Sequence, residues 1–173
     1  DGIAFTRDLV SEPPNVLYPE EFARRVKALE SLGLEVEILG EAEMAKLGMG
    51  SLLGVGQGSV RDSQLAIIKW YGAADKSAQP VAFVGKGVCF DSGGLCIKGG
   101  AQMFDMKADM AGAAAVVGLL LSLARQKSPV HAVGVLGIAE NLPSGHSLKP
   151  REIIPTLSGQ TVEVFDTDAE GRL

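Results

Sequence analysis

The longest apolar run of the chain, AGAAAVVGLLLSLA over residues 111–124, is the feature that most limits what the sequence can fold into. It is shorter than the roughly 20 apolar residues that a membrane-spanning helix needs. Charged residues flank it, with Asp109 before it and Arg125 after it. We therefore predict a helix over residues 106 to about 126 that is buried in the core of a soluble protein, with no membrane partner.

Short apolar runs precede and follow this helix, at residues 64–72, 80–87 and 130–140. Runs of this length, bounded by turn residues, are typical of buried strands in an α/β sheet. Apolar and acidic residues alternate over 34–39, which predicts a half-exposed strand, and a last strand is predicted over 161–166.

A helix is predicted from Pro19, because Phe22, Val26 and Leu29 recur at three- and four-residue spacing and Gly33 is a suitable C-cap.

The remaining segments complete the expected organisation. Residues 41–48 read as a short helix, 49–59 as a glycine-rich turn or loop, and 141–153 as a loop. Helices and strands thus alternate along the chain. The predicted fold class is a single α/β domain, with a mixed, largely buried central sheet flanked by helices as an α/β/α sandwich.

Composition narrows the function classes. The net charge is −5 and the sequence pI is about 5.1, so a nucleic-acid partner is not expected for this segment. The spacing of Cys89 and Cys96 offers no partners for a disulfide or a thiolate metal site, and we expect two reduced thiols. These features predict a soluble cytoplasmic protein.

Lys86 and Asp91 fall at the end of an apolar strand, where ligands usually bind in α/β sheets. Taken alone, this pair is also consistent with a simple salt bridge. Similarly, Asp105 and Asp109 are consistent with acidic residues at the start of the long helix, where the helix dipole favours negative charge.

The segment DTDAEGRL, residues 166–173, favours a functional role for these acidic residues over the purely structural interpretations. In an extended chain, residues two apart point to the same side, which would bring Asp166, Asp168 and Glu170 to one face together with Arg172. Converging carboxylates repel one another, so the segment is either fully solvated or neutralised by cations. Two divalent ions would balance the four carboxylates of Asp91, Asp109, Asp168 and Glu170, and such a two-metal site activates water and polarises a carbonyl.

Three other features are assigned no chemistry. The string GVGQGSV, residues 54–60, lacks the Lys-Ser/Thr of a phosphate-binding loop and is predicted to be a plain turn. His131 and His146 are expected to be structural or solvated.

Taken together, VGKGVCFDSGG, the lysine of LCIKGG, DMKADMAGAAAV and TDAEGRL resemble the leucyl aminopeptidase (cytosol aminopeptidase) family. RDLVSEPPNVLYPEE and AENLPSG extend the resemblance over essentially the whole chain. The family's octapeptide is NTDAEGRL, and this chain has Asp166 at its first position. It also has Gly99 where the family usually has Pro, and Ala111 where Gly is common.

The resemblance implies a dinuclear metallo-exopeptidase that removes N-terminal residues, often leucine, from peptides with a free N-terminus. Its cofactors would be two divalent ions, Mn or Zn with Mg or Co also possible, and a bicarbonate-like anion. The resemblance implies two metal sites: a tighter one on Lys86, Asp91, Asp109 and Glu170, and a more exchangeable one on Asp91, Asp168 and Glu170. It implies that Lys98 polarises the substrate carbonyl and that Arg172 holds the anion. Met106 and Asp166 would contact the substrate.

The resemblance further implies that residues 1–173 are part of a catalytic domain, with an N-terminal domain before them and the rest of the domain after them. The full-length protein would be a homo-hexamer. Two alternatives stay open: a catalytically incompetent segment that keeps only the scaffold, and a secondary DNA-binding role.

Overall fold

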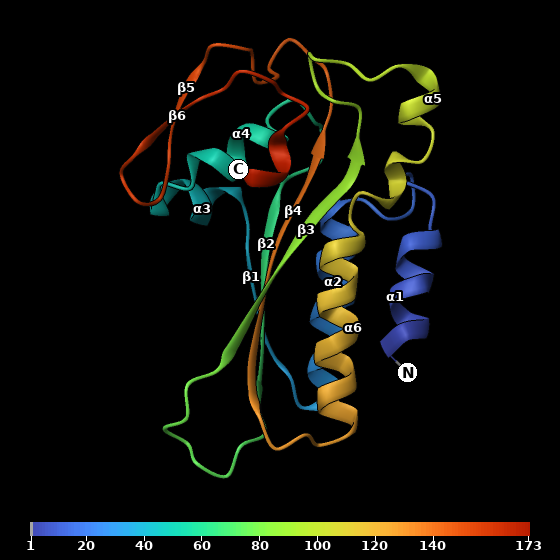
Figure 1. Cartoon of the computed structure of the whole chain (residues 1–173), viewed down its shortest axis with the longest axis vertical. Helices are drawn as coiled ribbons and strands as arrows, with labels where there is room; N and C mark the ends of the chain where they lie inside the picture. Colours follow the sequence, from blue (N-terminus) through green and yellow to red (C-terminus); the bar gives the residue numbers. More distant parts are fainter. Residues whose placement is uncertain (1) are drawn as a thin grey trace.

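A four-stranded mixed sheet forms the centre of the fold in the computed structural model, which describes residues 2–173 (Figure 1). The strand order is β1-β2-β4-β3; β1 pairs antiparallel with β2, β2 antiparallel with β4, and β3 parallel with β4. The strands are β1 (Glu35–Leu39), β2 (Gln64–Tyr71), β3 (Val81–Asp91) and β4 (His131–Asn141). The four central strands predicted from sequence are therefore confirmed.

Helices cover both faces of this sheet, so the predicted α/β class with a flanked mixed sheet is confirmed (Figure 1). One face carries α1 (Gly2–Ser11), α2 (Pro19–Lys27) and α6 (Ala111–Arg125). The other face carries, at one end of the sheet, α3 (Glu41–Leu47) and α4 (Gly50–Gly56). The larger core lies on the first face, where Phe22, Val117, Leu120, Leu136 and Ile138 are almost fully buried.

The apolar helix α6 lies between β3 and β4 in the sequence, because two adjacent parallel strands require a crossover connection. It packs closely on β3: a Cβ on Gly85 would lie 2.6 Å from Cα of Ala113. By length and composition alone, Gly100–Arg125 is apolar enough to cross a membrane. In the structure this stretch is divided into α5 (Gly100–Met103), a 3₁₀ turn (Met106–Ala108) and α6, which confirms α6 as a core helix of a folded domain.

The start of α6 was predicted too early. Met106–Ala108 form a 3₁₀ turn, at which the Ala108 amide donates to the Asp105 carbonyl, and α6 begins only at Ala111. The prediction that Asp109 lies in the first turns of the long helix is wrong for this reason. Asp109 instead lies in the connection between the turn and α6.

Two other segments differ from the prediction. Residues 49–59 were predicted as a loop, but they include the helix α4, whose Leu52 packs over Gly137 of the sheet. Glycine lowers helix propensity in isolated chains, and tertiary packing overrides it here. The last predicted strand is short: β6 (Thr161–Glu163) pairs with β5 (Ile153–Pro155) in a separate two-stranded sheet. The α1 helix was not predicted.

Helix α2 (Pro19–Lys27) begins at Pro19 as predicted, and Gly33, with a φ of 86°, is the predicted C-cap. The segment between them differs from the prediction, because Ala28–Leu32 form a 3₁₀ turn and not a continuation of the α-helix. Both cysteines are free, and burial raises the pKa of the Cys89 thiol.

The acidic residue Glu21 on α2 provides a test of surface electrostatics. Its carboxylate accepts hydrogen bonds from Arg24 and Arg25, at 2.6 and 2.8 Å from their Nε atoms, and these bonds lower its pKa from 4.5 to about 2. A lowered folded-state pKa contributes stability above pH 4.5 that is lost as the pH falls toward 2. We expect Glu21→Gln to lower Tm by about 2–4 °C at pH 7, and this difference to shrink toward zero as the pH falls to about 2 and below. Thermal denaturation across this range, with Glu43→Gln on α3 as control, measures it; a pH-independent difference would contradict the prediction.

Candidate metal centre

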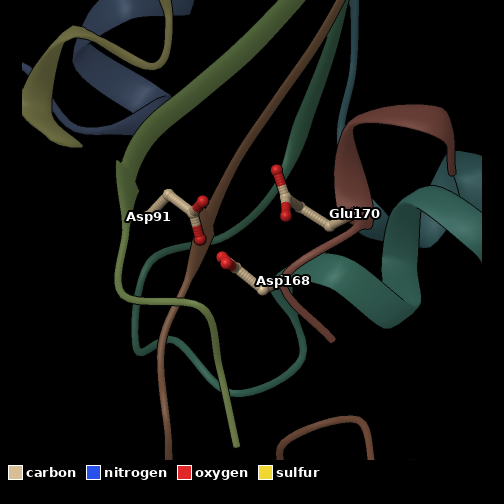
Figure 2. A group of neighbouring side chains, drawn as sticks. All are labelled: Asp91, Asp168 and Glu170. Carbon is tan, nitrogen blue, oxygen red and sulfur yellow. The ribbon is translucent and has the colours of Figure 1, made fainter. Parts of the chain in front are cut away.

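Three carboxylates converge at the carboxyl end of β3 (Figure 2). Asp91 is the last residue of β3, and Asp168 and Glu170 come from the segment that follows β6. One oxygen from each lies within 4.8 Å of the others, a spacing suited to a shared metal ion. Asp91 and Glu170 are buried, with 2% and 4% of their surface exposed.

Two lysines provide the positive charge beside these carboxylates. The Lys86 ammonium lies 2.6 Å from Glu170 and 2.7 Å from Asp109. The Lys98 ammonium lies 2.6 Å from Asp168 and 3.3 Å from Asp91. The simple Lys86–Asp91 salt bridge considered from sequence is therefore wrong: Asp91 pairs with Lys98, and Lys86 links Asp109 to Glu170.

Several buried oxygens of this cluster fit a cation. Among the described residues, Asp109 Oδ2, Asp168 Oδ1 and Glu170 Oε1 accept no hydrogen bond of good geometry, although each lies at ion-pair distance from a lysine. Oε2 of Glu170 is also buried without a hydrogen-bond donor in the described part of the chain. Buried carboxylate oxygens without donors are costly unless a cation meets them. The donor set therefore fits a divalent metal of the oxygen-preferring kind.

The pKa shifts at this site have two physical causes. Burial, the larger effect, raises the pKa of Asp109 and of Glu170, although Lys86 opposes it. Burial alone would lower the pKa of Lys86, but its bonds to Asp109 and Glu170 outweigh burial and raise it. The pKa of Lys98 is raised chiefly by its bond to Asp168. In the metal-free site both lysines are thus cations at neutral pH.

The segment that carries Asp168 and Glu170 is not extended, so the predicted mechanism of convergence is wrong. The Asp168 amide donates to Oδ1 of Asp166 at 2.8 Å in a tight turn, and a 3₁₀ turn (Glu170–Arg172) follows. This turn presents Asp168 and Glu170 to Asp91, while Asp166 and Arg172 are exposed. Asp166 instead stabilises the turn through its side chain.

The other predicted residues lie around this cluster. Met106, predicted to contact the substrate, is half-buried in the 3₁₀ turn three residues before Asp109. Arg172 lines an apolar cavity of about 290 Å³ that Lys86 and Glu170 also border. His131 is far from the site at the start of β4; its ring accepts from the Ala73 amide and bonds the Asp75 carbonyl, so its structural role is confirmed.

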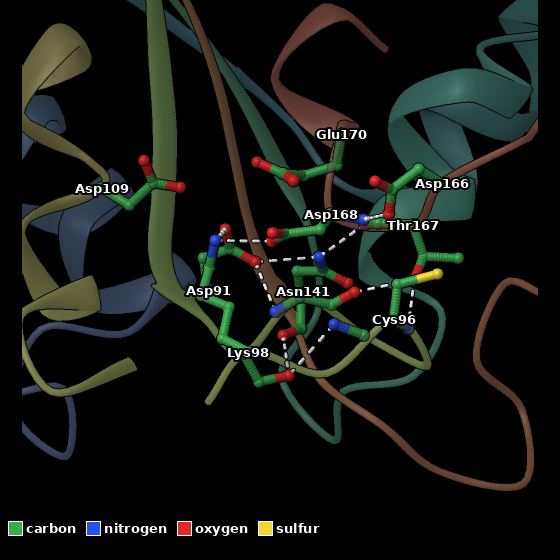
Figure 3. A network of polar contacts seen from close by, with 12 residues as sticks. Asp91, Cys96, Lys98, Asp109, Asn141, Asp166, Thr167, Asp168 and Glu170 are labelled. Carbon is green, nitrogen blue, oxygen red and sulfur yellow. Dashed lines mark hydrogen bonds and ion pairs between the residues drawn. The ribbon is translucent and has the colours of Figure 1, made fainter. Parts of the chain in front are cut away.

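Two buried polar residues of the site were not predicted from sequence, Asn141 and Thr167 (Figure 3). Thr167 joins the loop that carries Lys98 to the terminal segment: its hydroxyl donates to the Gly93 carbonyl and accepts from the Cys96 amide. In the sequence, Asn141 is part of the segment AENLPSG. Asn141 directly follows the strand predicted over residues 130–140, and in the structure it is opposite Asp91 in the parallel β3–β4 pair. A polar residue at the carboxyl end of a buried strand is the signal that could have identified it as part of the site.

The fold and the carboxylate cluster together define a class of protein. It is an α/β protein with a candidate cation site of carboxylates, flanked by lysines, at the carboxyl end of a parallel strand pair. Residues 4–173 match the family model described as "Cytosol aminopeptidase family, catalytic domain". The chain belongs to this family, as the sequence resemblance indicated. Members of this family are metal-dependent hydrolases.

Individual relatives agree with this assignment. The chain is 69% identical over its whole length to the "Probable cytosol aminopeptidase" of Caulobacter vibrioides, and 58% identical to that of Methylorubrum populi. It spans 35% of the length of each of these relatives. Among solved structures, it is similar to the bottromycin maturation enzyme BotP in complex with Mn, with a TM-score of 0.91 and 38% identity over 99% of this chain and 37% of that one.

Proposed function

We propose that this chain provides the metal centre of an aminopeptidase that hydrolyses the first peptide bond of a peptide with a free N-terminus. The convergence of Asp91, Asp168 and Glu170 beside two lysines is the observation that carries the proposal. Family membership supplies the reaction class, and the site supplies the residues that would perform it.

Two divalent ions fit the donor set. Lys86, Asp91, Asp109 and Glu170 would hold the tighter ion, and Asp91, Asp168 and Glu170 the more exchangeable one, with the Asp168 backbone carbonyl. The Mn complex of BotP supports manganese as one of the ions, with zinc, magnesium or cobalt as alternatives for the same ligands. When bound, such ions activate water and polarise the scissile carbonyl. Lys86 would bind metal only as a neutral amine.

Lys98 and Arg172 would act on the reacting groups. The Lys98 ammonium is held by Asp168 and Asp91 at the edge of the cluster, where a positive charge stabilises an oxyanion that forms from the substrate carbonyl. Arg172 is exposed and lies two residues after Glu170, a position from which it would hold a bicarbonate-like anion that serves as general base.

Met106 and Asp166 would contact the substrate, and Met106 would favour a leucine-like N-terminal side chain. The cytoplasmic location is supported by the names of the curated relatives. The homo-hexamer and the placement of residues 1–173 within a longer catalytic domain rest on the family resemblance and on the 35% coverage of those relatives.

Calorimetric titration of Mn and Zn into the metal-stripped chain tests the proposal. We expect two ions per chain for the unmodified protein. We expect Asp91→Ala to abolish measurable binding, because Asp91 contributes to both ions. Asp62→Ala, a change on an exposed loop, is the matched control and should bind as the unmodified chain does. Absence of binding to the unmodified chain would refute the metal centre in these residues.

A further inference from the structure

We propose that Asn141 is a positioning residue that fixes the Asp91 carboxylate and the Asp168 segment in the spacing that metal binding requires. This inference rests on the proposed metal site. Asn141 is the last residue of β4, is 5% exposed, and lies directly opposite Asp91 in the parallel β3–β4 pair. Its side-chain amide reaches both parts of the site (Figure 3).

The first contact orients Asp91. The Asn141 amide nitrogen donates to Oδ1 of Asp91 at 2.9 Å, and the Gly93 amide donates to the same oxygen at 2.8 Å. Two buried donors on Oδ1 fix the plane of the carboxylate and leave Oδ2, which faces Lys98 at 3.3 Å, as the oxygen turned toward the cluster. Hydrogen bonds of this kind tune a metal ligand and hold its orientation.

The second contact fixes the other side of the site. The same Asn141 nitrogen donates to the Thr167 carbonyl at 2.9 Å, directly before Asp168. Asp91 is 50 residues from Asn141 in sequence, and Thr167 is 26 residues away. One amide group therefore joins the end of β3 to the segment that carries Asp168 and Glu170.

The side chain of Asn141 can be replaced without loss of the hydrogen bonds that its main chain makes. The main-chain carbonyl of Asn141 accepts from the Ser92 amide at 3.0 Å and from the Ser92 hydroxyl at 2.7 Å, and any residue at this position keeps that carbonyl. Only a side chain with two N–H donors serves both acceptors. Leucine has a similar size and offers none, and an aspartate would place a second carboxylate against Asp91.

Calorimetric titration of Mn into metal-stripped Asn141→Leu tests the proposal, with thermal denaturation of the metal-free protein alongside. Ser147→Ala is the matched control: Ser147 is also buried, and its hydroxyl donates to the Leu142 carbonyl and accepts from the Ser144 amide, both within the loop after β4. Asn141→Leu thus removes two buried side-chain hydrogen bonds, and Ser147→Ala removes the partly buried hydrogen bonds of its hydroxyl. We expect both to lower Tm, and only Asn141→Leu to weaken Mn binding, by about 10–100-fold.

Asn141→Ser provides a second variant should the leucine variant not fold, because its short hydroxyl cannot serve both acceptors; the same loss of affinity is expected. Mn affinity within threefold of the unmodified chain in a folded Asn141 variant, or an equal loss in Ser147→Ala, would overturn the positioning role while leaving the metal centre intact. If the unmodified chain itself bound no Mn, the metal centre and this role would both be refuted.

Discussion

Replacing Lys98 with methionine is expected to lower kcat about 10²–10³-fold while metal affinity stays unchanged or rises. The Lys98 ammonium lies 2.6 Å from Asp168 and 3.3 Å from Asp91, and its raised pKa keeps it cationic at neutral pH. Methionine has a similar length but no charge, so the stabilisation of an oxyanion is lost. Loss of a cation beside the carboxylates does not weaken, and can strengthen, their attraction for a divalent ion.

The activity assay uses a chimera in which these 173 residues replace the matching segment of the Caulobacter vibrioides relative. Hydrolysis of a leucyl amide gives kcat and KM, and calorimetry on the 173-residue chain gives metal affinity. Lys76→Met, on the exposed β2–β3 connection, is the control. A Lys98 variant that kept kcat within threefold would contradict the role in catalysis, and one that lost its metal would assign Lys98 to metal binding instead.

Replacing Glu170 with glutamine is expected to weaken metal binding more than 100-fold and to leave the fold nearly unchanged. Glu170 is 4% exposed, and both of its carboxylate oxygens are buried without good hydrogen-bond donors in the described part of the chain. Glu170 is the proposed ligand of both ions, and a neutral glutamine does not supply the negative charge that holds them. Burial already disfavours that charge and raises its pKa, so a neutral amide of the same shape fits the metal-free fold.

Thermal denaturation in EDTA separates these two effects. We expect the free energy of unfolding of the metal-free chain to change by at most about 1 kcal/mol, because the partly exposed Lys86 keeps Asp109 at 2.7 Å. Added Mn should then raise Tm in the unmodified chain and not in Glu170→Gln. Glu152→Gln, which removes only the exposed pair with Lys149, should respond to Mn as the unmodified chain does. A Glu170 variant stabilised normally by Mn would contradict the ligand role.

The main sheet was predictable because each of its strands has a local signal. Apolar runs between turn residues mark β2, β3 and β4, and alternation marks β1. Helix α4 was not predictable in the same way, since its glycines favour a loop and only packing of Leu52 against the sheet selects the helix. The separation of β5 and β6 from the main sheet is likewise a tertiary property that no local pattern encodes.

The carboxylates of the site were predictable from sequence because several carboxylates close together repel one another and therefore indicate a bound cation. The sequence could not give their pairing. Lys98 rather than Lys86 meets Asp91, because the loop of residues 92–98 turns back over the end of β3, with the Lys98 amide bonded to the Ser92 carbonyl. Asn141 was missed because its position after a buried strand is only a weak signal, and its importance depends on contacts with residues 50 and 26 positions away.

The lysine–carboxylate pairs bear on how the proposed metal centre would be assembled. Many small metal sites are unformed until the ion arrives, and there the ion drives folding. In this chain Lys86 and Lys98 already neutralise part of the charge of four carboxylates, so the carboxylates lie together in the metal-free fold. Binding of the proposed ion would then replace one positive charge with another at carboxylates that folding has already brought together.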